Sequence, residues 1–195
     1  MYKLYGSTTS PYVRRLRIWL ANTQHEFINM QIFESEDRTI LITKNPALKV
    51  PALEHVVGDE STLIYDSRVI YRYLSEQLEY ASLSWDQENQ LTLVDSVNDS
   101  LVQMFLLSKS DVVADTDKLF FKLQKERVNN VLAELNEQVE RGKFNSWNYP
   151  AICLFSLIDW IEFRSLHNLK GLSALLDFHQ ENAQRIEVTA TDPRM

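Results

Sequence analysis

The sequence contains a single cysteine and only four glycines among its 195 residues. A lone Cys153 cannot form a disulfide within the chain, which suits a reducing compartment. None of the glycines belongs to a GxGxxG or Walker phosphate loop, so the sequence offers no support for nucleotide chemistry. The four histidines show no metal-ligand spacing, and neither HExxH nor a paired CxxC is present. We therefore expect no metal.

Long apolar runs and basic stretches are also missing. The longest apolar run is "AICLFSLI", whereas crossing a bilayer takes about 20 residues. The N-terminus, "MYKLYGS", lacks the basic start and apolar run of a secretion signal. The 20 basic and 27 acidic side chains give a net charge of −7, and no cluster of Lys and Arg stands out. We expect a cytoplasmic protein that binds neither membranes nor nucleic acids.

The first 78 residues alternate between strand and helix signals. Strand-like content marks "YKLY" and "HEFINMQIF", and between them "VRRLRIWLA" places Val13, Leu16 and Leu20 on one helical face. This order predicts a parallel βαβ unit. Two further strands, "VPALEH" and "STLIYD", flank a turn at Gly58-Asp59, and the helix "SRVIYRYLSEQL" follows them. The prediction for this region is βαβ followed by ββα.

After a short polar linker at 79–84, the strand signals disappear. Apolar residues at helical spacing predict two long helices, with members at 94, 97, 101 and 105 and then at 121, 128, 131, 132, 135 and 139. The segment "NYPAICLFSLIDWIEFR" is apolar nearly all round, as a central helix should be, and Asn148 is placed to cap it. A final helix is predicted in "LSALLDFHQENAQRI". Residues 85–195 are therefore predicted to form an all-α bundle.

Three short motifs in the first 78 residues carry polar groups at element boundaries. Ser10 precedes Pro11 in "SPYVRR", a favourable helix start that capping alone explains. The motif "NPALKVPAL" comes directly before the hairpin. In "IYDSRVIYRYL", Asp66 and Ser67 stand at another helix start, where they fit either a cap or an anion site.

Together, the strand and helix order and these three motifs resemble cytosolic glutathione transferases, particularly the bacterial serine-type members. The resemblance covers essentially the whole chain. It implies two domains: a thioredoxin-like α/β domain at 1–78 that binds glutathione, and an all-helical domain at 85–195 that binds the second substrate. It also implies a homodimer.

The resemblance assigns roles to five residues that would hold glutathione. Pro51 matches the family's cis-proline, which turns the chain so that Val50 presents its N–H and C=O to the cysteinyl part of the tripeptide. Lys49 is suited to the glycine carboxylate. Asp66 faces the α-amino group, and Ser67 with the helix N-terminus binds the γ-glutamyl carboxylate.

The same resemblance gives Ser10 the catalytic role of donating a hydrogen bond to the glutathione sulfur. A free thiol has a pKa of about 8.5, so a hydroxyl donor beside a helix N-terminus would favour the thiolate. Three nearby hydroxyls, on Ser7, Thr8 and Thr9, are alternatives. Many family members carry a cysteine where this chain has Ser10, and its absence argues against glutaredoxin-like exchange.

The function that follows is a glutathione transferase, with glutathione as co-substrate and a small electrophile as the acceptor. Two alternatives stay open. One is a non-catalytic interaction protein of the same family, like the relatives that bind RNA polymerase. The other keeps glutathione but performs isomerisation, dehalogenation or peroxide reduction.

Overall fold

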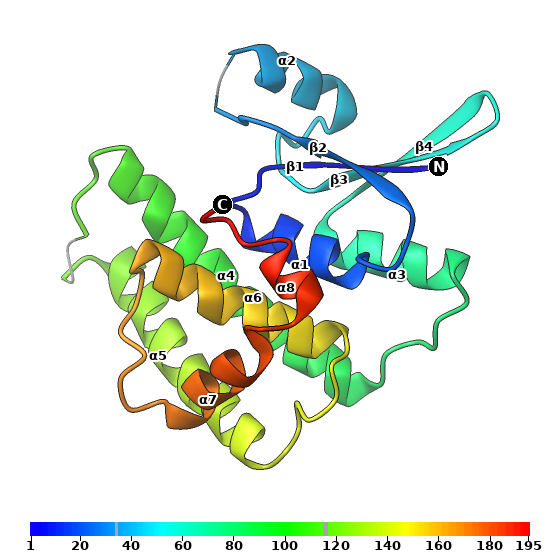
Figure 1. The fold of residues 1–195 in the computed structure, drawn as a ribbon. Coiled ribbons are helices and arrows are strands. Elements are labelled where there is room, and N and C mark those ends of the chain that lie inside the picture. Colours follow the sequence, from blue (N-terminus) through cyan, green and yellow to red (C-terminus); the bar gives the residue numbers. More distant parts are fainter. Residues whose placement is uncertain (34, 115–116) are drawn as a thin grey trace. The chain divides into compact units, whose positions relative to one another are not determined.

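The computed structural model describes residues 1–33, 35–114 and 117–195, which form two compact units (Figure 1). The first unit comprises Met1–Ser82 together with Arg185–Met195, and the second comprises Leu83–Gln184. The chain passes between the units at the predicted linker, but the segment 185–195, predicted with the helical domain, packs in the first unit. The domain boundaries stay a prediction, because compact packing is not independent folding.

The first unit is built on a four-stranded mixed sheet in the order β2-β1-β3-β4. Strand β1 (Tyr2–Gly6) pairs in parallel with β2 (His25–Asn29) and antiparallel with β3 (Ala52–Val57), which forms the predicted hairpin with β4 (Glu60–Tyr65). The predicted βαβ and ββα order is therefore confirmed, and the unit is thioredoxin-like.

Helices α1 (Pro11–Trp19) and α3 (Ser67–Gln77) lie together on one face of the sheet (Figure 1). A fully buried layer is formed by residues from both helices and from the two central strands: Leu4, Val13, Leu16, Leu53, Ile70 and Leu74. Gly6 lets α1 approach the sheet, because a Cβ at that position would come within 2.4 Å of a Val13 methyl carbon. These contacts fix the start of α1 next to the end of β1.

Helix α2 (Ser35–Lys44) covers the opposite face of the sheet (Figure 1). This helix is not among the elements predicted from the sequence. Leu41 is its buried apolar residue, packed with Tyr5 and Met30, while Ile40 and Ile42 on either side are exposed. An amphipathic stripe is therefore absent, and the β-branched run around Leu41 does not suggest a helix.

A buried carboxylate ties α2 to the sheet. The hydroxyl of Tyr5 donates to Oε2 of Glu54 at 2.7 Å, and the ammonium of Lys44 lies 2.9 Å from both carboxylate oxygens. These hydrogen bonds hold the pKa of Glu54 below its ordinary value and raise the pKa of Lys44. These polar contacts help to hold α2 against the sheet, because the helix has little buried apolar surface of its own.

Replacing Glu54 with glutamine is expected to lower the free energy of unfolding by about 1 to 3 kcal/mol at pH 7. A carboxyl whose pKa is depressed in the folded state stabilises above its unfolded pKa, and this contribution is lost as the pH falls through the folded value. The difference in the free energy of unfolding between wild type and Glu54→Gln should therefore be constant at neutral pH and become smaller below about pH 4.5. Urea titrations at several pH values measure it. A difference independent of pH would contradict this prediction.

The C-terminal segment joins the first unit through the short helix α8 (Ile186–Thr189), which contacts α1. The guanidinium of Arg14, buried in α1, donates to the carbonyl oxygen of Val188 at 3.4 Å. Within α8, Val188 is 3% exposed and Ile186 is 85% exposed. Val188 thus packs in the first unit, whereas Ile186 faces solvent.

Substituting Val188 with alanine is expected to destabilise the first unit by about 1 to 3 kcal/mol, because it leaves a cavity beneath α8. The matched variant Ile186→Ala, in the same helix, should change stability by less than about 0.5 kcal/mol. Thermal unfolding of both variants checks the pair. Equal effects would mean that α8 does not pack as described.

The second unit consists of helices α4 (Trp85–Lys109), α5 (Leu119–Glu140), α6 (Tyr149–Arg164) and α7 (Ser173–Asn182). This confirms the predicted helical region. Helix α6 is buried throughout Tyr149–Ile161 and packs against α4 and α7. As predicted, Asn148 caps α6 by accepting from the N–H of Ala151 at 3.1 Å. The predicted final helix, 172–186, ends as α7 at Asn182, and its last residue, Ile186, begins α8 in the other unit.

Across the residues that the structure describes, no helix is both long enough and apolar enough to span a membrane.

Candidate functional site

The register of the sheet brings the three polar motifs to one edge. Tyr5 is paired with Ala52, and Ala52 is also paired with Tyr65. This row therefore contains the end of β1, the start of β3 and the end of β4. The three motifs lie just beyond it: the turn leading to Ser10, the Val50-Pro51 bond and the Asp66-Ser67 step.

Ser10 is the N-cap of α1, with Pro11 in the first turn, as predicted. Its Oγ accepts from the N–H of Val13 at 3.4 Å, a long hydrogen bond that leaves the hydroxyl proton to another acceptor. By contrast, the hydroxyls of Ser7 and Thr9 lie 3.2 Å apart, so one of them donates to the other. Among these three hydroxyls, Ser10 is the one that forms no hydrogen bond with a neighbouring hydroxyl of the turn in the described structure.

The loop between α2 and β3 brings backbone N–H and C=O groups to this edge of the sheet. The Val50-Pro51 peptide bond is cis, as the family resemblance implied. Lys49 is exposed, and within the described residues the N–H and C=O of Val50 take part in no hydrogen bond. The buried side chain of Asn45 shapes the loop by donating to the carbonyl of Lys49 at 2.7 Å and accepting from the N–H of Ala47 at 3.0 Å.

Asp66 caps α3 from an unusual backbone conformation. Its φ of 68° and ψ of 133° lie where non-glycine residues are rare, at a typical cost of about 1 to 3 kcal/mol. Oδ1 accepts from the N–H groups of Arg68 and Val69, at 2.8 and 3.3 Å. Oδ2 accepts no hydrogen bond from any residue described in the structure, and the side chain is exposed. One carboxylate oxygen thus serves as the cap and the other faces solvent.

Ser67, the first residue of α3, differs from Asp66 in being 1% exposed. Its Oγ accepts a hydrogen bond from Nη2 of Arg15, which is itself buried in α1. The middle of α1 and the start of α3 are thus joined through this buried pair.

Sequence reasoning missed two residues that shape this edge, Asn45 and Arg15. The Asn-Pro step at 45–46 is a turn signal that marks the end of α2. Nothing local in the sequence predicts that Arg15 meets Ser67, since 52 positions separate them.

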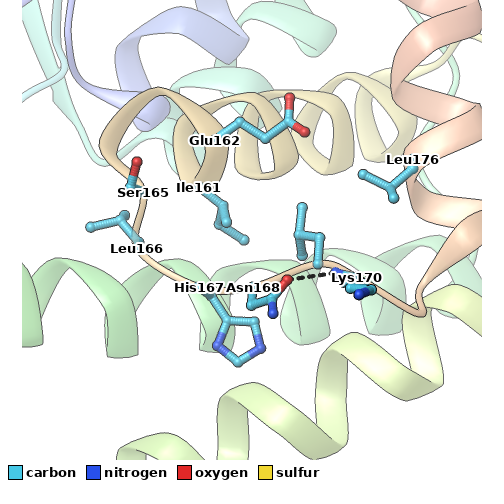
Figure 2. A pocket seen from close by; sticks show the side chains of 9 residues that line it. Ile161, Glu162, Ser165, Leu166, His167, Asn168, Lys170 and Leu176 are labelled. Carbon is cyan, nitrogen blue, oxygen red and sulfur yellow. Dashed lines mark hydrogen bonds between the residues drawn. The ribbon is translucent and has the colours of Figure 1, made fainter.

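A pocket of about 760 Å³ lies in the second unit, where the loop between α6 and α7 folds back (Figure 2). Its lining includes Ile161, Glu162, His167 and Lys170. Burial lowers the pKa of His167, which therefore favours the neutral ring. None of the six predicted site residues lines this pocket.

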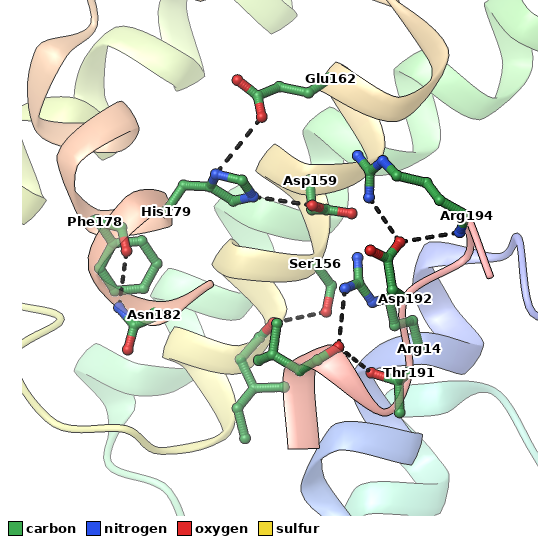
Figure 3. Close-up of polar contacts among 12 residues, drawn as sticks. Arg14, Ser156, Asp159, Glu162, Phe178, His179, Asn182, Thr191, Asp192 and Arg194 are labelled. Atoms are coloured by element: carbon green, nitrogen blue, oxygen red, sulfur yellow. Dashed lines mark hydrogen bonds and ion pairs between the residues drawn. The ribbon is translucent and has the colours of Figure 1, made fainter. Parts of the chain in front are cut away.

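Also in the second unit, His179 of α7 is held between two carboxylates of α6 (Figure 3). Its Nε2 lies 3.0 Å from Oδ1 of Asp159, its Nδ1 lies 3.6 Å from Oε2 of Glu162, and its ring stacks on Phe155 with centroids 4.8 Å apart. This arrangement joins two helices. Among the described residues, no group of three or more His, Cys, Asp or Glu side chains could hold a metal ion.

Comparison with known proteins agrees with this architecture. Residues 4–81 match the family model "Glutathione S-transferase, N-terminal domain". No curated protein matches the chain significantly.

Solved structures resemble the chain over nearly its full length. A glutathione S-transferase from Methylobacillus flagellatus KT, solved with glutathione bound, is 22% identical with a TM-score of 0.83, covering 99% of this chain and 100% of that one. A glutathione transferase family member from Pseudomonas fluorescens Pf-5, also with bound glutathione, is 22% identical with a TM-score of 0.79 and 99% coverage of both chains. One from Methylobacterium radiotolerans JCM 2831, in complex with glutathione sulfonate, is 19% identical with a TM-score of 0.81, covering 97% and 93%. Residues 4–81 thus match the N-terminal domain of glutathione S-transferases, and over nearly its whole length the chain has the fold of these solved glutathione transferases.

Proposed function

We propose that this protein binds glutathione at the sheet edge described above and activates its thiol for attack on a small electrophile. The observation that carries the proposal is the convergence of three groups beyond one row of the sheet. These are the Ser10 hydroxyl, the free backbone of Val50, and the solvent-facing Oδ2 of Asp66 at the start of α3. The relatives from Methylobacillus and Pseudomonas, solved with glutathione bound, support the choice of ligand.

In this proposal each part of the tripeptide has a partner. The cysteinyl backbone pairs with the N–H and C=O of Val50, which Pro51 turns toward it. Lys49 attracts the glycine carboxylate. Oδ2 of Asp66 accepts from the α-ammonium group, and the N-terminus of α3, with Ser67, attracts the γ-glutamyl carboxylate.

Ser10 acts on the sulfur of the bound ligand. Its hydroxyl donates a hydrogen bond to the sulfur and stabilises the thiolate, whose proton is released to solvent. The thiolate then attacks an electrophilic carbon: a sulfur–carbon bond forms, and the leaving group departs with the electron pair of the bond that breaks. Holding both reactants together contributes through proximity.

Three parts of this proposal rest on the family resemblance: an electrophile as the second substrate, a homodimer and a cytoplasmic location. Tyr65 and Val69, at the end of β4 and in the first turn of α3, are exposed apolar side chains that a second copy of the chain would cover. Light scattering on the purified protein measures the oligomeric state, and a monomer at micromolar concentration would remove the dimer from the proposal.

A conjugation assay with 1-chloro-2,4-dinitrobenzene tests the proposed reaction. We expect a glutathione-dependent rate above the uncatalysed one and release of chloride in equal amount. Glutathione binding without turnover of this or other electrophiles would favour the non-catalytic reading. Reduction of a peroxide at the expense of glutathione would favour peroxidase chemistry instead.

A further inference from the structure

Asn45, which directly follows α2, holds the loop between α2 and β3 together. It is 2% exposed. Its side chain donates to the carbonyl of Lys49 at 2.7 Å and accepts from the N–H of Ala47 at 3.0 Å. Its backbone N–H donates to the carbonyl of Leu41 in α2 at 2.7 Å, and its carbonyl accepts from the N–H of Leu48 at 2.9 Å. One residue thus connects the end of α2 with three positions of the loop.

The partners of the side chain require an amide at this position. A backbone carbonyl can only accept and a backbone N–H can only donate, so Nδ2 of Asn45 faces Lys49 and its Oδ1 faces Ala47. Within the loop, Leu48 has a φ of 56°, which is uncommon for a residue with a side chain. The hydrogen bonds to Asn45 on either side of Leu48 hold this conformation in place.

The hydrogen bond to Lys49 sets the orientation of a peptide plane. The carbonyl of Lys49 and the N–H of Val50 belong to one trans peptide unit, in which these two groups point in opposite directions. Because the buried Asn45 holds the carbonyl, the N–H of Val50 points away from Asn45. No acceptor for this N–H exists in the described part of the chain.

Apolar contacts fix the side chain of the same residue. Val50 packs against a buried cluster that includes Tyr5, Leu41 and Ala52. Leu41 belongs to α2, so this helix holds the side chain of Val50 through Leu41 and its backbone through Asn45. The N–H of Val50 is therefore held in one direction before any ligand arrives, which lowers the entropic cost of binding one.

We propose that Asn45 is a positioning residue: by holding the carbonyl of Lys49, it directs the N–H of Val50 toward the cysteinyl carbonyl of glutathione. The inference rests on the proposed function, in which Val50 pairs with the cysteinyl backbone. Asn45 contacts no part of the ligand and acts through the orientation of the peptide plane.

The test combines Asn45→Ala with a glutathione analogue in which an (E)-alkene replaces the amide between cysteine and glycine. This analogue lacks the cysteinyl carbonyl. Wild type should bind glutathione about tenfold more tightly than the analogue, and in the variant this preference should fall to about twofold. Such non-additivity indicates that the changed side chain and the removed carbonyl are coupled.

Kinetics with glutathione give a second readout. Asn45→Ala should raise Kd and KM for glutathione by about tenfold, because the ligand loses the directed N–H of Val50. The value of kcat at saturating glutathione and the pKa of the bound thiol should stay close to those of wild type, since Ser10 is unchanged. General disorder of the first unit would lower kcat as well.

Two further variants separate positioning from folding. Asn45→Asp keeps an acceptor for the N–H of Ala47 but loses the donor to the carbonyl of Lys49, so it should lose the ligand preference as Asn45→Ala does. Asn136→Ala is the matched control. Asn136 lies in α5, is 8% exposed, and likewise donates one side-chain hydrogen bond and accepts another. Its replacement should leave the preference at the wild-type value.

Equal weakening of both ligands by Asn45→Ala would overturn the inference and leave Asn45 a purely structural residue. If Asn45→Ala does not fold, a wild-type preference in Asn45→Asp would overturn it in the same way. Wild-type protein that binds glutathione no better than the alkene analogue would also overturn it, since the cysteinyl carbonyl would then have no partner. Wild-type protein that binds neither ligand would instead contradict the proposed function, so the two failures are distinguishable.

Discussion

Replacing Asp66 with asparagine is expected to weaken glutathione binding by about 10- to 100-fold while leaving the stability of the fold nearly unchanged. The asparagine oxygen can accept from the N–H groups of Arg68 and Val69 as Oδ1 does, and asparagine tolerates a positive φ better than most residues. The variant therefore keeps the cap. It loses the charge and replaces the open Oδ2 with a donor, which removes a charge-assisted hydrogen bond of about 1.5 to 3 kcal/mol.

The loss of affinity should depend on the α-amino group of the ligand. For glutaryl-cysteinylglycine, which lacks only that amine, wild type and Asp66→Asn should bind alike within about twofold. Calorimetric titrations with both ligands, alongside thermal unfolding, give the answer. Unchanged affinity for glutathione in the variant would leave Asp66 with a capping role alone.

Replacing Ser10 with alanine is expected to raise the pKa of the bound glutathione thiol by about one to two units, because each unit corresponds to about 1.4 kcal/mol of lost preference for the thiolate. Turnover at pH 7 should fall about 10- to 100-fold, and Kd for glutathione should change little. At high pH the rates should converge, since the thiol then ionises without help. Loss of the cap should appear separately, as a decrease of about 0.5 to 2 kcal/mol in the free energy of unfolding.

The matched variant is Ser10→Thr, which keeps both a hydroxyl and a capping oxygen. Its thiol pKa should stay close to that of wild type. Ultraviolet titration of thiolate absorbance in each complex measures the midpoint directly. An identical midpoint in wild type and Ser10→Ala would return Ser10 to a capping role and move the search to the other hydroxyls of the turn, those of Ser7, Thr8 and Thr9.

Features with a local signal could be predicted from the sequence. The Gly58-Asp59 turn marks the hairpin, and Asn148 marks the start of the apolar helix α6. The motifs around Ser10 and Asp66 lie at helix starts, which can be recognised because serine and aspartate are common capping residues. Each of these features is determined by residues within a few positions along the chain.

Features that depend on distant contacts could not be predicted in this way. Helix α2 buries a single leucine, Leu41, and is held to the sheet by the Lys44 and Glu54 pair, so its sequence lacks an amphipathic period. The return of residues 185–195 to the first unit and the meeting of Arg15 with Ser67 are set by packing between segments far apart along the chain. The spacing of apolar residues within one segment does not indicate which distant segment it will contact.

The most direct measurement is a calorimetric titration of the wild-type protein with glutathione. We expect saturable binding at or below millimolar glutathione, with release of a proton at neutral pH that is absent for S-methylglutathione, since that ligand has no thiol to ionise. The proton release is obtained by repeating the titration in buffers of different ionisation enthalpy. If millimolar glutathione produced no heat of binding and displaced no other ligand from the protein, that result would contradict the proposal that this sheet edge is a glutathione site.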